Sequence, residues 1–257
     1  SMTFVGNIRN SGIVMDRFLG FFKSLLEIGI KIDDSFIIKD VIMKKRRSNL
    51  MDTIKVENGK LTVLKGKMAA GKSMAMLIDA KDYIDFKMGV LFFSLEQSSA
   101  KIYDKFFDKV KAKKENSAFM HVIDMASSLD TIEKVIEDAT GKVSIIYIDS
   151  IEAVRGSKND DVLRKLHKIA KETKTPIVIT SQVSAENEDT TDFDKLVGEI
   201  KELVPADIYD DCNKQIVLRN FSKYESYDYF SSTVRTVNPD GSVDTYSTFN
   251  LSDYFNN

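Results

Sequence analysis

Cysteine, histidine and tryptophan are almost missing from this chain of 257 residues. Cys212 is its one cysteine, His121 and His167 are its two histidines, and tryptophan does not occur. A single cysteine cannot form an internal disulfide bond, which fits a reducing, cytoplasmic setting. One cysteine and two histidines also fall short of the four ligands that structural zinc sites use, so we expect no such metal centre.

Long apolar runs and a dominant charge are missing as well. No run approaches the roughly 18 apolar residues of a membrane-spanning helix, and the first residues lack the basic start and apolar block of a signal peptide. We therefore expect no membrane partner. The chain carries 37 lysines and arginines against 39 acidic residues, a net charge of −2. Any binding to nucleic acid must then come from a local patch.

Short apolar runs alternate with helical patterns from residue 61 onward. The runs that we predict as strands are LTVLK (61–65), VLFFSL (90–95), FMHVID (119–124), SIIYID (144–149) and PIVITS (176–181). Helical patterns occupy residues 72–86, 98–114, 129–140 and 158–173. This alternation predicts an α/β fold with a mainly parallel sheet and helices on both faces.

The texture changes after residue 211. Three further apolar runs follow: KQIVLR (214–219), FSSTVRTV (230–237) and SVDTYSTF (242–249). The turn sequence NPDG (238–241) joins the last two, so we predict an antiparallel hairpin at the edge of the sheet.

The first 50 residues differ from the rest. VMDRFLGFFKSLLEIGI (14–30) has apolar residues at helical spacing, which predicts a helical arm or linker. Two alternatives stay open for its apolar stripe, because it could pack on its own domain or dock on a neighbouring subunit. We expect the main domain to occupy residues 51–257.

A phosphate-binding motif lies between the first predicted strand and helix. GKMAAGKS (66–73) matches G-x-x-x-x-G-K-[ST] in its required strand–loop–helix context. Glycine lets the backbone approach the phosphates closely, and the successive N–H groups direct positive partial charge at them. The motif predicts bound ATP, contacted by Gly66, Lys67, Met68, Ala69, Ala70, Gly71, Lys72 and Ser73. Lys72 would bridge the β- and γ-phosphates, and the Ser73 hydroxyl would bind Mg²⁺.

A second acidic group is expected to help hold Mg²⁺. Asp149 ends the apolar run SIIYID, and a carboxylate at the end of a buried strand beside the phosphate loop suits this task. Asp124 ends the run FMHVID and competes for the role. We prefer Asp149 because its run is more apolar.

Two further strand ends resemble those of the RecA-like ATPase core of DnaB-type replicative helicases. VLFFSLEQS (90–98) is similar to the strand of that family whose glutamate polarises the attacking water, and Glu96 matches it. PIVITSQVS (176–184) is similar to the strand whose glutamine senses the γ-phosphate, and Gln182 matches it. The resemblance covers roughly residues 50–250, with the motifs in the family's order.

The resemblance implies an ATP-hydrolysing motor that acts on single-stranded DNA. It implies self-association into a ring or filament, with a hexamer among the options, in a bacterial or phage-infected cell. A replication or loader protein would be a further partner. Two alternatives stay open. IDSIEAV (148–154) also resembles RecA- and RadA-type recombination proteins, and an ATP-gated loader or adaptor would need the same nucleotide site without translocating.

Two regions depart from the family pattern. The family's Lys-x-Arg-Asn-Gly-like motif, which supplies an arginine finger to the neighbour's ATP, is replaced by STVRTVNPDGSV (232–243). Arg235 is our finger candidate, with Arg219 and Lys223 as rivals.

The second departure is the acidity of residues 184–211, where ten acidic residues face only two lysines, a net charge of −8. A loop that touches the DNA backbone should gain from cations. We therefore expect any DNA contact to come from backbone amides or from Arg155 and Lys158, which follow Asp149.

Overall fold

The computed structural model of the chain describes residues 53–250, except 126–127, 185–186, 188–192 and 225–226. The predicted N-terminal arm, residues 1–50, lies outside the described residues and stays a prediction. None of the helices in the described part of the chain has the length and apolar character needed to span a bilayer.

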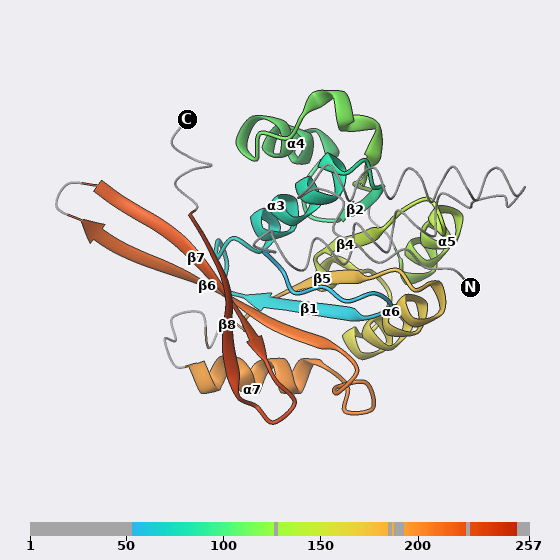
Figure 1. Cartoon of the computed structure of the whole chain (residues 1–257). Helices are drawn as coiled ribbons and strands as arrows, with labels where there is room; N and C mark the ends of the chain where they lie inside the picture. Colours follow the sequence, from blue (N-terminus) through green and yellow to red (C-terminus); the bar gives the residue numbers. More distant parts are fainter. Residues whose placement is uncertain (1–52, 126–127, 185–186, 188–192, 225–226, 251–257) are drawn as a thin grey trace, which may run out of the picture. The chain divides into compact units, whose positions relative to one another are not determined.

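One mixed sheet forms the centre of the described structure (Figure 1). Its strands are β1 (Leu61–Gly66), β2 (Val90–Ser94), β3 (Met120–Ile123), β4 (Ile145–Asp149), β5 (Ile177–Gln182), β6 (Asn213–Tyr224), β7 (Tyr227–Val237) and β8 (Val243–Asn250). Their order is β3-β2-β4-β5-β1-β6-β7-β8. Pairing is parallel from β3 to β6 and antiparallel from β6 to β8. The prediction of a mainly parallel α/β sheet with antiparallel C-terminal strands is confirmed.

Helices cover both faces of the sheet. They are α3 (Lys72–Asp85), α4 (Ser99–Asp104), α5 (Leu129–Ala139), α6 (Asn159–Thr173) and α7 (Phe193–Leu203). One face packs against α5, α6 and α7 in a single core that includes Ile136, Leu166 and Ile200. α3 contacts β1, β2, β4 and β5 from the opposite face, and Figure 1 shows α3 and α4 on the side opposite α6 and α7. Burial on both faces explains why β1, β2 and β4 are buried along their whole length.

The helix predicted over residues 98–114 is broken in the structure. α4 ends at Asp104, and Lys105–Lys109 continue as a wider π-helical turn. The backbone of Lys111 then has a φ of 57°, which a right-handed helix cannot contain. A 3₁₀ turn at Lys114–Phe119 leads into β3. The prediction of one continuous helix was therefore wrong in its second half.

The acidic stretch 184–211 is not one loop, which corrects our expectation. Its middle forms α7, whose apolar residues Leu196, Val197 and Ile200 are buried against the sheet. The i, i+1, i+4 spacing of these residues is a helical signal that the many acidic residues between them obscured.

The segment that follows α7 is tied to α6 by ion pairs. Arg164 donates from Nε to both carboxylate oxygens of Asp207 at 3.1 Å, and Lys171 contacts Asp211 at 2.6 Å. These hydrogen bonds lower the pKa of both aspartates. Each exposed pair adds little stability. Together they show that part of the acidity of residues 184–211 is compensated within the chain.

We predict opposite effects of one substitution at two glycines. A methyl group at Gly198 in α7 would meet no atom within 4 Å, and the same holds for Gly141, whose φ is +78°. Gly198→Ala should stabilise the fold by about 0.5–1 kcal/mol, since alanine loses less backbone entropy on entering a helix. Gly141→Ala should destabilise it by about 1 kcal/mol, because an L side chain is strained in the left-handed region. Urea unfolding measures both, and a shift of the same sign in both variants would contradict this account.

Candidate functional site

A cavity of about 520 Å³ opens at the carboxyl ends of the parallel strands. The strand ends meet there because β2, β4, β5 and β1 are neighbours in the sheet, and ligands of open α/β sheets bind at this edge. Its lining comprises Met68, Ala69, Ala70, Gly71, Lys72, Ser73, Met74, Glu96, Gln97, Lys105, Asp149, Ser150, Gln182 and Arg219. Six of the eight phosphate-loop residues, and three of the polar side chains predicted at other strand ends, therefore share one cavity.

The phosphate loop is held in place by β6 and β7. A Cβ atom at Gly66 would lie 2.7 Å from the carbonyl oxygen of Val217, so only glycine fits there. Ser232 of β7 donates a buried hydrogen bond of 2.7 Å from Oγ to the carbonyl oxygen of Ala70. Gly71 has a φ of 95° and precedes the first residue of α3. The loop therefore presents its N–H groups and a helix N-terminus to the cavity, an arrangement that attracts anions.

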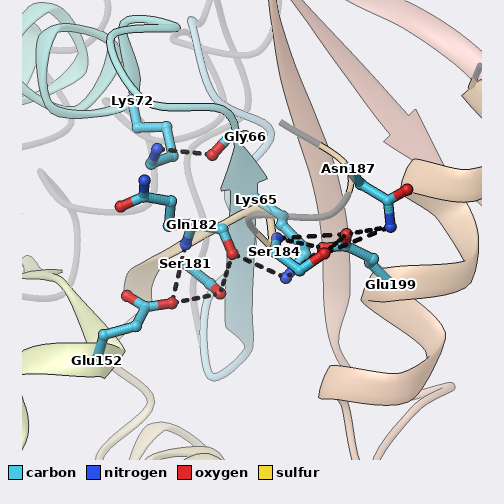
Figure 2. Close-up of polar contacts among 9 residues, drawn as sticks. All are labelled: Lys65, Gly66, Lys72, Glu152, Ser181, Gln182, Ser184, Asn187 and Glu199. Atoms are coloured by element: carbon cyan, nitrogen blue, oxygen red, sulfur yellow. Dashed lines mark hydrogen bonds and ion pairs between the residues drawn. The ribbon is translucent and has the colours of Figure 1, made fainter. Parts of the chain in front are cut away.

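The ammonium group of Lys72 lies over the phosphate loop. Its Nζ donates to the carbonyl oxygens of Gly66 and Lys67 at 2.7 and 2.8 Å. Figure 2 shows the Gln182 side chain pointing toward the same ammonium group. A phosphate group placed between loop and strand β5 would meet both side chains.

Asp149 joins three parts of the site through two hydrogen bonds. Ser73 donates from Oγ to Oδ2 at 2.6 Å, and Thr180 of β5 donates from Oγ1 to Oδ1 at 2.7 Å. The hydroxyl and carboxylate oxygens of Ser73 and Asp149 are the ligands that Mg²⁺ prefers. Among the described residues, no group of three histidine, cysteine or acidic side chains could hold a metal ion. A magnesium ion here would therefore need oxygens of the nucleotide as further ligands.

Asp124, the rival of Asp149, lies away from the cavity lining. Its Oδ2 accepts a hydrogen bond of 2.6 Å from the backbone N–H of Ser99. This hydrogen bond lowers the pKa of Asp124. The carboxylate serves the N-terminus of α4 instead, which favours Asp149 as the metal ligand.

Glu96 follows β2 and reaches across to the end of β4. Its exposed carboxylate accepts a hydrogen bond of 2.5 Å from the hydroxyl of Ser150. A carboxylate held at the rim of a phosphate site can orient and polarise a water molecule.

Lys105 is a cavity residue that the sequence analysis missed. Its Nζ donates to Gln97 Oε1 at 2.6 Å. Burial lowers the pKa of Lys105, an effect that the nearby Asp149 carboxylate opposes. Its place on the helical stretch that starts directly after Glu96 was the available signal. It adds a second cation to the site, opposite the phosphate loop.

The other predicted basic residues lie in different places. Arg235 lies on β7, where its Cζ is 5.2 Å from the centre of the Phe193 ring. It does not line the cavity of its own chain, whereas Arg219 does. Arg155 and Lys158 are exposed in the connection between β4 and α6, outside the lining residues.

No protein-family model matches the chain, and no curated protein matches its sequence. Solved structures do match. A DnaB-like replicative helicase, studied with its interactions with primase, shares 17% identity at a TM-score of 0.54, over 91% of this chain and 70% of that chain. A second structure, the ATPase domain of a DnaB-like replicative helicase, shares 17% identity at a TM-score of 0.62, over 96% of this chain and 98% of that domain. The chain therefore has the RecA-like fold of a DnaB-like helicase ATPase domain.

We predict that Asp149 and Asp124 differ in their effect on metal-dependent binding. Asp149→Asn removes the carboxylate charge beside Ser73, so Mg²⁺ should strengthen the binding of a fluorescent ATP analogue at least about tenfold less than in the unaltered chain. Asp124→Asn is the matched control and should leave the Mg²⁺ effect unchanged. A magnesium titration of analogue binding compares the three proteins, and an equal loss in both variants would refute the assignment of Asp149.

Proposed function

We propose that the chain is a magnesium-dependent ATPase that works as a ring or filament on single-stranded DNA, as a replicative DNA helicase motor. One observation carries the proposal: Lys72, Ser73, Glu96, Asp149 and Gln182 line a single cavity at adjacent strand ends. These are the residues that the nucleotide motif and the family resemblance assign to phosphate binding, metal binding, water activation and γ-phosphate sensing. The RecA-like fold supports the same conclusion.

The chemistry of phosphoryl transfer suits this set of groups, because catalysis relies on positioning and charge stabilisation. Lys72 and the loop N–H groups would neutralise charge on the phosphates. Ser73 and Asp149 would hold Mg²⁺, which supplies further charge stabilisation when bound. Glu96 would orient the attacking water, and Gln182 would sense the γ-phosphate.

The proposed contact with DNA draws on the exposed basic residues Arg155 and Lys158, near the metal-binding strand end. Partial compensation of the acidic stretch 184–211 by Arg164, Lys171 and Lys65 weakens the main electrostatic objection to DNA binding. A protein partner from replication fits as well, since one helicase of this fold was studied with its interactions with primase.

A loader or adaptor that does not translocate is our second candidate. The observation that favours it is the remaining acidity of residues 184–211, which suits a basic protein surface better than a DNA backbone. A recombination ATPase is the third alternative. Strand displacement would support the helicase, filaments whose length follows that of the DNA would support recombination, and ATP-dependent capture of a protein without stimulation by DNA would support the loader.

We predict that Glu96→Gln keeps ATP binding and slows ATP hydrolysis by about 10²–10⁴-fold, because an amide cannot accept the proton of the attacking water. Glu137→Gln, at an exposed position of α5, is the matched control and should hydrolyse ATP normally. Nucleotide affinity and turnover are measured on the same preparations. Unchanged turnover in Glu96→Gln would place the water-activating group elsewhere.

We also predict that two inactive variants restore each other when mixed, if Arg235 is a finger for the neighbour's ATP. A Lys72→Ala subunit keeps its finger, and an Arg235→Ala subunit keeps its phosphate site. A finger supplied by a neighbour contributes on the order of 10³–10⁵ in rate, so the mixture should hydrolyse ATP faster than either variant alone.

Arg219→Ala provides the comparison for this mixing test, because Arg219 lines the cavity of its own chain. Mixing Arg219→Ala with Lys72→Ala should restore nothing, since each variant then has a defective site of its own. Restored activity with Arg219→Ala, and none with Arg235→Ala although the subunits co-assemble, would transfer the finger role to Arg219.

A further inference from the structure

A buried ion pair lies directly beneath the candidate site. Lys65 precedes the first glycine of the phosphate loop, and its Nζ is 3.2 Å from Oε2 of Glu199 in α7. The two side chains are only 8% and 9% exposed. Removing both charges from water has a large cost, which such a pair seldom recovers in stability. Stability alone is therefore a poor reason for a lysine at this place in the strand.

The pair holds the main chain on both sides of Gln182 (Figure 2). Lys65 donates from Nζ to the carbonyl oxygen of Gln182 at 3.0 Å. Glu199 accepts hydrogen bonds from the backbone N–H of Ser184 at 3.0 Å and from its hydroxyl at 2.5 Å. It also accepts one from Asn187 Nδ2 at 2.7 Å. One ammonium group and one carboxylate thus fix the chain as it leaves β5.

Glu152 completes the arrangement from the other side. Its Oε1 accepts hydrogen bonds from the backbone N–H of Gln182 at 2.9 Å and from the hydroxyl of Ser181 at 2.8 Å. The backbone N–H and carbonyl of Gln182 are therefore both bound to charged side chains. The Gln182 side chain remains directed into the cavity, toward Lys72.

Glu199 stays ionised at neutral pH. Burial alone would raise its pKa, but hydrogen bonds from Ser184, Asn187 and Lys65 outweigh burial and bring the pKa of Glu199 to about 2. The carboxylate therefore keeps its charge and all of its hydrogen bonds throughout the range in which an ATPase would work.

We propose that Lys65 and Glu199 are positioning residues that aim Gln182 at the nucleotide phosphates. This inference rests on the proposed ATPase function and adds two residues that neither the motifs nor the resemblance assigns. Lys65 and Gly66 pair with Ser181 and Gln182 in the sheet. One lysine thus links the phosphate loop, the γ-phosphate-sensing strand and α7.

The variant Lys65→Met/Glu199→Gln tests the proposal without leaving an unpaired buried charge. Removing both charges together should preserve the fold, since uncharged replacements of buried pairs are often neutral in stability. We expect kcat for ATP to fall about 10–100-fold, because a displacement of about 1 Å at a reacting group has effects of this size. The KM for ATP should change by less than about threefold. Lys165→Met/Glu133→Gln, which removes a pair between α6 and α5, is the matched control and should keep normal kinetics.

A second comparison separates positioning from a general effect on the fold. In a Gln182→Ala background the double substitution should cause no further loss of kcat, because residues that act through the same group are not additive. The preference for a nonhydrolysable ATP analogue over ADP should fall to the same level in both single-site series. Multiplying losses, or normal kcat in the Lys65→Met/Glu199→Gln variant, would overturn the inference. Absence of ATP hydrolysis by the unaltered chain would instead overturn the proposed function on which it rests.

Discussion

Parallel pairing of β2, β4, β5 and β1 is the constraint on which the rest of the structure depends. Because these strands run in the same direction, their carboxyl ends meet at one edge and carry their polar residues with them. The strand β4 then fixes the phosphate-binding helix at two points. Tyr147 donates a buried hydrogen bond of 2.6 Å to Asp79 of α3, and Asp149 accepts one of 2.6 Å from Ser73 at the start of that helix.

Charged groups under the site tie the strand ends to one another. Asp149 bonds to α3 and β5, Glu152 bonds to β5, and Lys65 joins β1 to β5 and α7. A nucleotide that bound in the cavity would contact groups that are already held in place, which is the arrangement that electrostatic catalysis requires. Such a connected site also offers a route by which the state of the phosphates could reach α7.

The sheet and the phosphate loop could be predicted from sequence because their signals are local. Apolar runs bounded by helical patterns indicated each parallel strand, and NPDG located the last hairpin. Asp149 was preferred over Asp124 on the apolar character of its strand, and the geometry around Ser73 agrees. The roles of Glu96 and Gln182 came from resemblance, and the structure adds that both side chains line the cavity.

What sequence could not supply depends on contacts between distant segments. Lys65 looked like an ordinary end of an apolar strand, since its partner Glu199 lies 134 positions away in a stretch that we expected to form an acidic loop. The break after α4 arises from a left-handed residue, Lys111, that no glycine announced. Lys105 belongs to the site only because that broken helix brings it over the cavity.

The most direct test of the account is the steady-state rate of ATP hydrolysis by the unaltered chain with Mg²⁺, measured with and without single-stranded DNA. The account predicts hydrolysis that depends on Mg²⁺, rises with protein concentration and increases when single-stranded DNA is added. A folded protein that binds no ATP, or that binds it without hydrolysis under all of these conditions, would contradict the account.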